Sequence, residues 1–253
     1  MGKVVFIGVG PGDPELLTLK GKRILEEASV IIYAGSLVNP EILKFTKPGV
    51  EIYDSATMNL DDYLNLMIKS VQEGKLVARV HDGDPSIYGA IQEQIDHLMA
   101  KGIDFEVVPG VSSLFAAAAS LKRELTLPSI SQTVIITRPE GKTPVPEKRL
   151  IKDLAKHKAT IAIFLGIKQI DSVVEDLLQG GLPKDTPVAA VYKASWPEEK
   201  IIESTLENIS KKVKEVGFEK TTLIIVGEVL KPKTYEFSKL YDPTFTHGYR
   251  KGR

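Results

Sequence analysis

The chain has 253 residues, which corresponds to roughly two small domains or one large one. Hydrophobic residues make up 43% and charged residues 26%, an ordinary globular composition that excludes a disordered or collagen-like chain. The 33 Lys and Arg balance the 33 Asp and Glu, which argues against a protein that coats nucleic acid. The absence of cysteine excludes disulfides, thiolate nucleophiles and Cys-type zinc sites.

The first half of the chain alternates short β-branched runs with helical patterns. Strands are predicted at 4–7, 30–33, 51–53, 76–80 and 105–108, and helices at 16–28, 60–71, 86–100 and 112–121. This rhythm predicts a mainly parallel sheet covered by helices on both faces. We expect a cytoplasmic protein without a membrane partner, since no signal segment and no run of about 20 apolar residues is present.

The second half begins after a polar, proline-broken stretch at 122–131, which we interpret as a linker. Strands are predicted at 133–137, 160–165, 187–192 and 222–226, and helices at 147–157, 169–178 and 206–216. Strands and helices alternate less strictly here, so a mixed sheet is expected. The predicted organisation is therefore two α/β domains, 1–121 and 132–253.

Three strand-to-helix junctions in the first domain are rich in glycine and proline: 8–14, 81–89 and 109–113. In a parallel sheet they fall at one rim, at the carboxyl ends of the strands, where ligands bind in open α/β folds. A plainer interpretation is that Asp13, Asp84 and Ser112 are N-caps of the following helices. Three such junctions on one rim favour a binding site, because caps alone need no glycine-rich approach.

A dinucleotide fingerprint would need a third glycine at the position of Asp13, so such a cofactor site is not expected. Asp82 and Asp84 form an Asp-x-Asp pair, which leaves a magnesium-dependent nucleotide transferase as an alternative class. We predict no metal site.

Residues 8–18 (GVGPGDPELLT) and 83–89 (GDPSIYG) resemble the two signature segments of the tetrapyrrole methylases, which are S-adenosylmethionine-dependent enzymes acting on corrin and siroheme precursors. The segments 108–113, 164–166 and 186–189 follow in the order expected for that family. Segments 34–38, 55–57, 131–133, 137–138 and 140–144 resemble the branch that methylates C11 of precorrin-4 or cobalt-precorrin-4 in cobalamin biosynthesis.

The resemblance implies a homodimer whose S-adenosylmethionine lies in a cleft between the two domains, leaving as S-adenosylhomocysteine. The cofactor contacts it implies are Pro11, Asp82, Gly83, Asp84, Ile87, Ser112, Ser113, Leu165, Ala190, Ala194 and Thr222. Asp82 stands where the family pattern leads us to expect a small residue. Methylation of another tetrapyrrole position, diphthine synthesis and a module that only senses S-adenosylmethionine remain as alternatives.

A substrate with many carboxylates calls for cationic side chains, since guanidinium groups bind carboxylates with two parallel hydrogen bonds. The candidates near the rim are Arg79, Arg138, Lys142 and Lys193, and Tyr88 and Trp196 are candidates for packing on the flat ring. No catalytic residue is predicted, because the substrate carbon is itself the nucleophile and the sulfonium supplies the activation.

Overall fold

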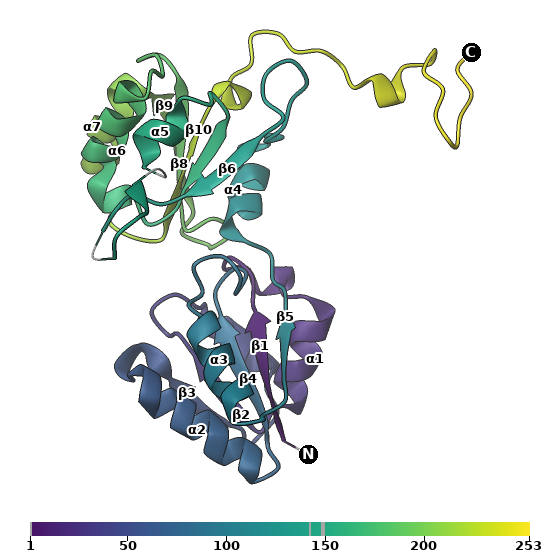
Figure 1. The fold of residues 1–253 in the computed structure, drawn as a ribbon, viewed down its shortest axis with the longest axis vertical. Coiled ribbons are helices and arrows are strands. Elements are labelled where there is room, and N and C mark those ends of the chain that lie inside the picture. Colours follow the sequence, from purple (N-terminus) through teal and green to yellow (C-terminus); the bar gives the residue numbers. More distant parts are fainter. Residues whose placement is uncertain (1, 142, 148–149) are drawn as a thin grey trace. The chain divides into compact units, whose positions relative to one another are not determined.

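The structure, a computed structural model, describes residues 2–141, 143–147 and 150–253. The chain divides into two compact units, residues 1–117 with 193–199 and residues 118–192 with 200–253. Figure 1 labels the helices and strands of both. Among the described residues, no helix combines the length and the apolar character that crossing a bilayer requires.

The first unit contains an all-parallel sheet of five strands in the order β3-β2-β4-β1-β5. The strands are β1 (Lys3–Gly8), β2 (Val30–Tyr33), β3 (Glu51–Asp54), β4 (Leu76–His81) and β5 (Phe105–Val108). Because all five run the same way, their carboxyl ends share one edge of the sheet. β1 lies between β4 and β5, so the loops that follow these three strands are neighbours.

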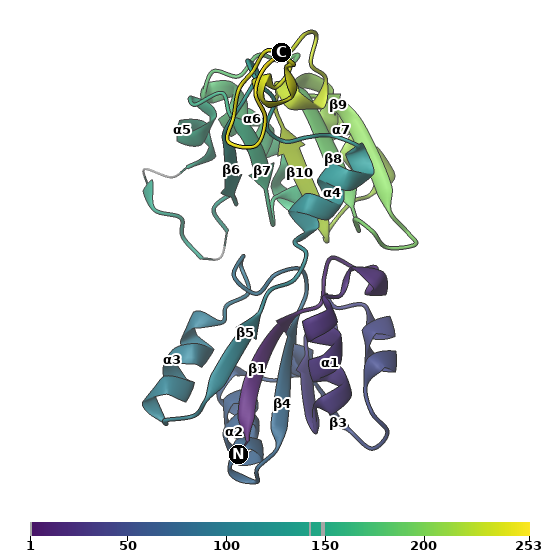
Figure 2. The same ribbon diagram turned by 90° about the vertical axis from the view of Figure 1, so that its right-hand side faces the viewer.

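Helices cover both faces of this sheet, as Figures 1 and 2 show. α1 (Leu19–Glu27) packs on one face, and α2 (Leu60–Gln72) and α3 (Gln92–Ala100) pack on the other. The buried apolar residues of the strands alternate between these two cores, with Val5 and Ile7 facing α1 and Val4 and Phe6 facing α2. Each such side chain contributes about 1.5–3 kcal/mol when fully buried, which holds the strand ends in place.

The second unit contains a mixed sheet in the order β6-β7-β10-β8-β9. Its strands are β6 (Val134–Thr137), β7 (Thr160–Ile163), β8 (Pro187–Tyr192), β9 (Lys200–Thr205) and β10 (Thr222–Val226). β6 and β7 are parallel, and β10 is antiparallel to both β7 and β8. α5 (Ile151–Ala155), α6 (Ile170–Gln179) and α7 (Leu206–Val216) pack on one face, and α4 (Ser113–Leu121) precedes the sheet in the chain.

The two α/β domains, one parallel and one mixed, confirm the predicted fold class. The largest local differences concern helix starts and one edge strand. α3 begins at Gln92 rather than at residue 86, because Tyr88 and Ala90 have positive φ angles that a helix does not allow. The first helix begins at Leu19, after its N-cap Thr18, and β9 was not predicted.

The boundaries of the units differ from the expected ranges in two places. The stretch 122–131, expected to be a linker, packs within the second unit: Arg123 donates to the Leu230 carbonyl and the Thr160 hydroxyl donates to the Leu125 carbonyl. Residues 193–199, expected in the second domain, belong to the first unit because Ser195 and Trp196 bond to its loops.

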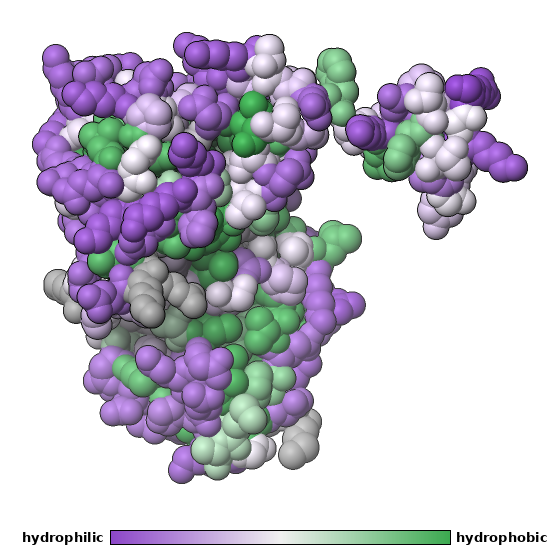
Figure 3. All heavy atoms as spheres, turned by 45° about the horizontal axis from the view of Figure 1, so that its top comes forward, coloured by the Kyte–Doolittle hydropathy of each residue, from purple (hydrophilic) through white to green (hydrophobic). Residues whose placement is uncertain are grey.

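Hydrophilic side chains cover most of the surface visible in Figure 3, and apolar side chains are exposed on the C-terminal segment. That segment holds a short 3₁₀ turn, Lys239–Tyr241, and Arg250 bonds to the carbonyls of Leu240, Asp242 and Phe245. Phe237, Tyr241 and Tyr249 are its most exposed aromatic residues.

Candidate active site at the carboxyl edge of the first sheet

Three loops meet where β1, β4 and β5 end. We call them the first rim loop (Val9–Asp13), the second rim loop (Asp82–Gly89) and the third rim loop (Pro109–Ser112). The first and second loops pair directly, since Gly83 N–H donates to the Gly10 carbonyl at 2.8 Å and Gly10 N–H to the Gly83 carbonyl at 3.3 Å. The sequence placed these loops at one rim, and the structure brings them into contact.

Glycine is required where the three backbones approach each other. A Cβ added to Gly8 would lie 2.6 Å from both the Gly110 nitrogen and the Gly83 oxygen, and one added to Gly110 would overlap the same Gly83 oxygen. These obstacles are backbone atoms, which cannot rotate away as a side chain can. The close approach therefore fixes the relative positions of all three rim loops.

Asp84 links the second rim loop to the third. Its carboxylate accepts hydrogen bonds from the Ser86 nitrogen and the Gly110 nitrogen, each at 2.9 Å, and from the Ser86 hydroxyl. Partial burial alone would raise the pKa of the Asp84 carboxyl, but these bonds outweigh it and hold the pKa below its usual value. Asp84 is thus an ionised bridge between two loops, and it does not cap α3.

The other two proposed caps serve local turns. Asp13 caps the 3₁₀ turn Pro14–Leu16 by accepting from the Glu15 nitrogen at 2.9 Å. Ser112 is buried, and its side chain accepts from the Leu114 nitrogen at 3.3 Å at the start of α4. Ser113 opens that helix. At Asp13 and Ser112 the predicted capping role is therefore confirmed.

Asp82 and its neighbour His81 lie in opposite environments. The Asp82 side chain is open to solvent, although the protein around it raises its pKa by desolvation. His81 is buried, and desolvation, assisted by the nearby Arg79 charge, lowers its pKa to about 3. Within the described part of the chain no three metal-ligating side chains gather, and the Asp84 carboxylate is engaged by the Ser86 and Gly110 nitrogens.

Arg79 lies beneath the rim rather than on it, with only 6% of its surface exposed. Its guanidinium donates to the Gln94 side chain, to the Ile32 carbonyl and to the Ser55 hydroxyl, and it sits 4.9 Å from the centre of the Tyr63 ring. Arg79 therefore holds the loop after β3 in place and is not presented to solvent.

The tip of the second rim loop is strained. Tyr88 has a φ of 56° and is 46% exposed, and Ala90 has a φ of 49°. Such angles in residues other than glycine persist only where the surroundings require them, and they cluster at binding sites. Ile87, whose nitrogen donates to the Asp84 carbonyl, precedes this strained tip.

Residues 193–199 bring the predicted residues Lys193 and Ala194, and also Trp196, to the first unit. Lys193 lies 4.8 Å from the centre of the Trp196 ring and pairs with Glu198 at 3.3 Å. The Trp196 indole donates to the Pro11 carbonyl at 2.7 Å. Sequence reasoning missed Ser195 and Asn39, which bond to the same loop.

In the second unit the predicted residues gather at one edge of the mixed sheet. Leu165 follows β7, Arg138 follows β6, and Thr222 opens the antiparallel β10, so all three share that edge. Leu165 is 69% exposed and has a φ of 55°, the same kind of strained position as Tyr88. Ala190 lies within β8, buried opposite Ile224.

The structure describes one of the two substrate-binding candidates in the proline-rich loop, Arg138, and does not describe the other, Lys142. The Arg138 guanidinium donates to the carbonyls of Pro139, Thr143 and Pro144 and so folds its own proline-rich loop. Lys142 lies outside the described residues. Two surface hollows of the second unit, of about 400 and about 270 Å³, contain none of the predicted site residues.

The chain is thus a two-domain α/β protein whose glycine-rich loops meet at the carboxyl ends of the parallel strands, the place where open α/β folds bind ligands. The chain belongs to the tetrapyrrole (corrin/porphyrin) methylases, whose family model matches residues 3–210. It is 63% identical to a cobalt-precorrin-4 C(11)-methyltransferase of Methanocaldococcus jannaschii over 249 residues, covering 98% of this chain and 96% of the other. A homologue of the same name from Priestia megaterium is 48% identical over 253 residues, covering 99% and 98% of the two chains.

Solved structures agree with these relatives. A cobalt precorrin-4 methyltransferase superposes with a TM-score of 0.89 at 47% identity, covering 91% of this chain and 96% of that one. A uroporphyrin-III C-methyl transferase of Thermus thermophilus, complexed with S-adenyl homocysteine, gives 0.76 at 28% identity and covers 93% and 96%.

Proposed function

We propose that this protein transfers the methyl group of S-adenosylmethionine to C11 of cobalt-precorrin-4. The observation that carries the proposal is the contact of the three rim loops with one another and with the end of β1, through Gly8, Gly83 and Gly110, in a chain 63% identical to a cobalt-precorrin-4 C(11)-methyltransferase. The loop sequences that carried the family resemblance are the ones that meet.

The charge of the rim loops suits a ligand that carries a positive group. Asp84 keeps its carboxylate ionised at neutral pH, which favours a positive group nearby. The glycines allow the main chains of the rim to contact one another, which sets the shape of the surface on which we propose the ligand binds. We propose that Pro11, Gly83, Ile87, Ser112 and Ser113 line the site together with Asp84, and that Asp82 borders it.

When bound, S-adenosylmethionine supplies an activated methyl group and a neutral leaving group, so the chemical activation comes from the cofactor. The residues of the chain then have to orient the reactants and keep the other carbons of the substrate away from the methyl group. A reacting pair held in line and in contact gains roughly 7–11 kcal/mol over free encounter. The rigid rim loops suit this task because backbone contacts, rather than flexible side chains, set their positions.

We propose that some residues contact the substrate directly and that others position the residues that do. Tyr88, which is 46% exposed, and Lys193, which is partly exposed beside Glu198, are proposed to contact the macrocycle. Arg79 is proposed to act through Ser55, whose hydroxyl it bonds at 3.2 Å, since its guanidinium is buried. We propose that Leu165, Ala190, Ala194 and Thr222 contribute to cofactor binding, and Arg138 and Lys142 to substrate binding.

A methyl-transfer assay tests the function directly. The purified chain is incubated with methyl-labelled S-adenosylmethionine and cobalt-precorrin-4, and the product is analysed for the position of the label. We expect label at C11 and no requirement for added magnesium. Label on uroporphyrinogen III instead, or turnover of a nucleoside triphosphate that depends on magnesium, would contradict the proposal.

A homodimeric assembly and a cytoplasmic location are part of the same proposal. They are supported by the family resemblance and by the absence of cysteine, which suits a reducing compartment. Light scattering of the purified chain measures the assembly, and a mass of one protomer would contradict it.

A further inference from the structure

The segment 193–199, which we call the strap, joins β8 to β9 of the second unit but packs with the first. Two of its side chains bond to the first rim loop. The Ser195 hydroxyl accepts from the Asp13 nitrogen at 3.0 Å, and the Trp196 indole nitrogen donates to the Pro11 carbonyl at 2.7 Å. The strap therefore bonds to a loop more than 180 residues away in sequence.

The residue between these two anchor points is covered as well. A Cβ added to Gly12 would overlap atoms of the Trp196 ring, so the indole lies directly against the Gly12 backbone. The buried Asn39 amide donates to the Gly12 carbonyl at 2.8 Å. Three consecutive residues of the first rim loop thus have a backbone group held by a distant side chain.

The strap is itself held in an unfavourable conformation. Lys193 and Ser195 have φ angles of 47° and 70°, in the left-handed region that residues other than glycine rarely adopt. The Glu199 carboxylate accepts from the Ser195 nitrogen at 2.7 Å, and the Lys193 ammonium lies over the Trp196 ring. Backbone strain of this kind is kept where surrounding contacts over-determine it, which is common at ligand sites.

We infer that Trp196, assisted by Ser195, is a positioning residue that fixes the first rim loop in the shape that binds the cofactor. The inference rests on the proposed function, in which S-adenosylmethionine binds at the rim. A loop that is ordered before binding raises the apparent affinity, because that affinity is proportional to the fraction of molecules whose loop already has the binding conformation. The strap acts on binding, so its effect belongs in the KM for S-adenosylmethionine rather than in kcat.

The test compares three variants in the full chain. Trp196→Phe keeps an aromatic ring over Gly12 and removes the bond to Pro11, Ser195→Ala removes the bond to Asp13, and Trp196→Ala removes both the ring and its bond. Calorimetric titration with S-adenosylhomocysteine should show dissociation constants raised about 3–10-fold for the first two and about 10–100-fold for Trp196→Ala. The kcat at saturating S-adenosylmethionine should stay within about twofold of wild type.

A matched control removes a similar bond elsewhere in the first unit. Tyr53→Phe deletes a hydroxyl that donates to the Glu51 carboxylate at 3.0 Å in the edge strand β3, and should leave the affinity unchanged. If Trp196→Ala does not fold, Trp196→Phe and Ser195→Ala carry the test.

The results separate this inference from the function on which it depends. Folded strap variants that bind S-adenosylhomocysteine within twofold of wild type would overturn the inference. So would a rise in the KM for the tetrapyrrole alone, which would assign Trp196 to packing against the substrate ring. Wild-type protein that binds no S-adenosylhomocysteine would instead overturn the proposed function.

Discussion

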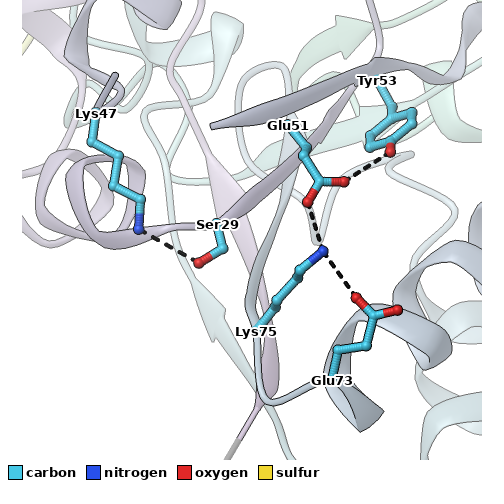
Figure 4. A network of polar contacts seen from close by, with 6 residues as sticks. All are labelled: Ser29, Lys47, Glu51, Tyr53, Glu73 and Lys75. Atoms are coloured by element: carbon cyan, nitrogen blue, oxygen red, sulfur yellow. Dashed lines mark hydrogen bonds and ion pairs between the residues drawn. The ribbon is translucent and has the colours of Figure 1, made fainter. Parts of the chain in front are cut away.

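The two edges of the first sheet are built in different ways. At the carboxyl edge, Gly8, Gly83 and Gly110 bring three backbones into contact. The Asp84 carboxylate there accepts hydrogen bonds from nitrogens of the second and third rim loops. At the amino edge the contacts are between charged and polar side chains, as Figure 4 shows for Ser29, Lys47, Glu51, Tyr53, Glu73 and Lys75. Main-chain contacts join three segments at the carboxyl edge, whereas at the amino edge exposed side-chain pairs accompany a close approach of the Gly2 backbone to the backbones of Val71 and Lys75.

The titration of the amino edge reflects its exposed pairs. Hydrogen bonds from Lys75 and then from Tyr53 lower the pKa of the Glu51 carboxyl, and the bond to Glu51 raises the pKa of Tyr53. All three side chains are accessible to water, where ion pairs contribute little because solvent and salt screen them. The comparison therefore predicts that substitutions matter much more at the carboxyl edge.

The largest effect is expected from Gly110→Ala. The added methyl group would overlap the Gly83 carbonyl and press on the Gly8 backbone, so the three rim loops would have to separate. Overpacking against backbone should cost about 3 kcal/mol and lower Tm by roughly 6–12 °C, with loss of methyl transfer. Differential scanning calorimetry measures the shift. Gly248→Ala, where a Cβ meets nothing, is the control, and equal Tm values for the two variants would refute the tight packing.

Arg79→Met should come next. It leaves the Gln94 side chain, the Ile32 carbonyl and the Ser55 hydroxyl without their donor, and unsatisfied buried groups should cost about 2 kcal/mol of unfolding free energy. Chemical denaturation measures this, with the exposed Arg23→Met as control. An unchanged unfolding free energy combined with a raised KM for the tetrapyrrole would show that Arg79 contacts substrate instead.

Asp84→Asn should cost about 1–2 kcal/mol and weaken binding of S-adenosylhomocysteine, while Asp61→Asn on the exposed start of α2 should do neither. The pKa of Asp84 is lowered by folding, so its contribution to stability is present above the unfolded pKa of about 3.9 and is lost as pH falls through the folded value. Denaturation between pH 6 and pH 3 should therefore show a steeper loss of stability for wild type than for the variant. Parallel profiles would contradict the bridging role.

The smallest effect is expected from Lys75→Met at the amino edge. This variant breaks the pairs with Glu51 and Glu73, both exposed, and should leave Tm and the methyl-transfer rate within error of wild type. A loss of activity comparable with that of Asp84→Asn would erase the distinction between the two edges.

The sequence predicted elements best where the hydrophobic residues follow a single period along a buried strand or an amphipathic helix. The predicted bounds match for β2, β5, β8, α7 and β10. β9 was missed because none of its residues is buried on this edge strand, so neither a buried run nor clean alternation marks it. α3 was extended too far because the sequence does not reveal that Tyr88 and Ala90 adopt positive φ angles.

The candidate site was predictable in its loops and not in its cross-contacts. Glycine, proline and aspartate at 8–14 and 81–89 indicated the rim because their conformational roles are local. The bond of Asp84 to Gly110 and that of Trp196 to Pro11 join residues 26 and 185 positions apart, and no local pattern encodes such pairings. The same holds for the burial of Arg79, which depends on Tyr63 and Gln94 from two helices.

Hydrogen exchange of the full chain with and without S-adenosylhomocysteine tests the location of the cofactor most directly. If the methyl donor binds where the parallel strands end, protection should rise at residues 9–13, 82–89 and 109–113, and the amino edge near Glu51 and Lys75 should exchange as before. Saturating ligand that protects other segments and leaves these three loops unchanged would contradict the proposed site.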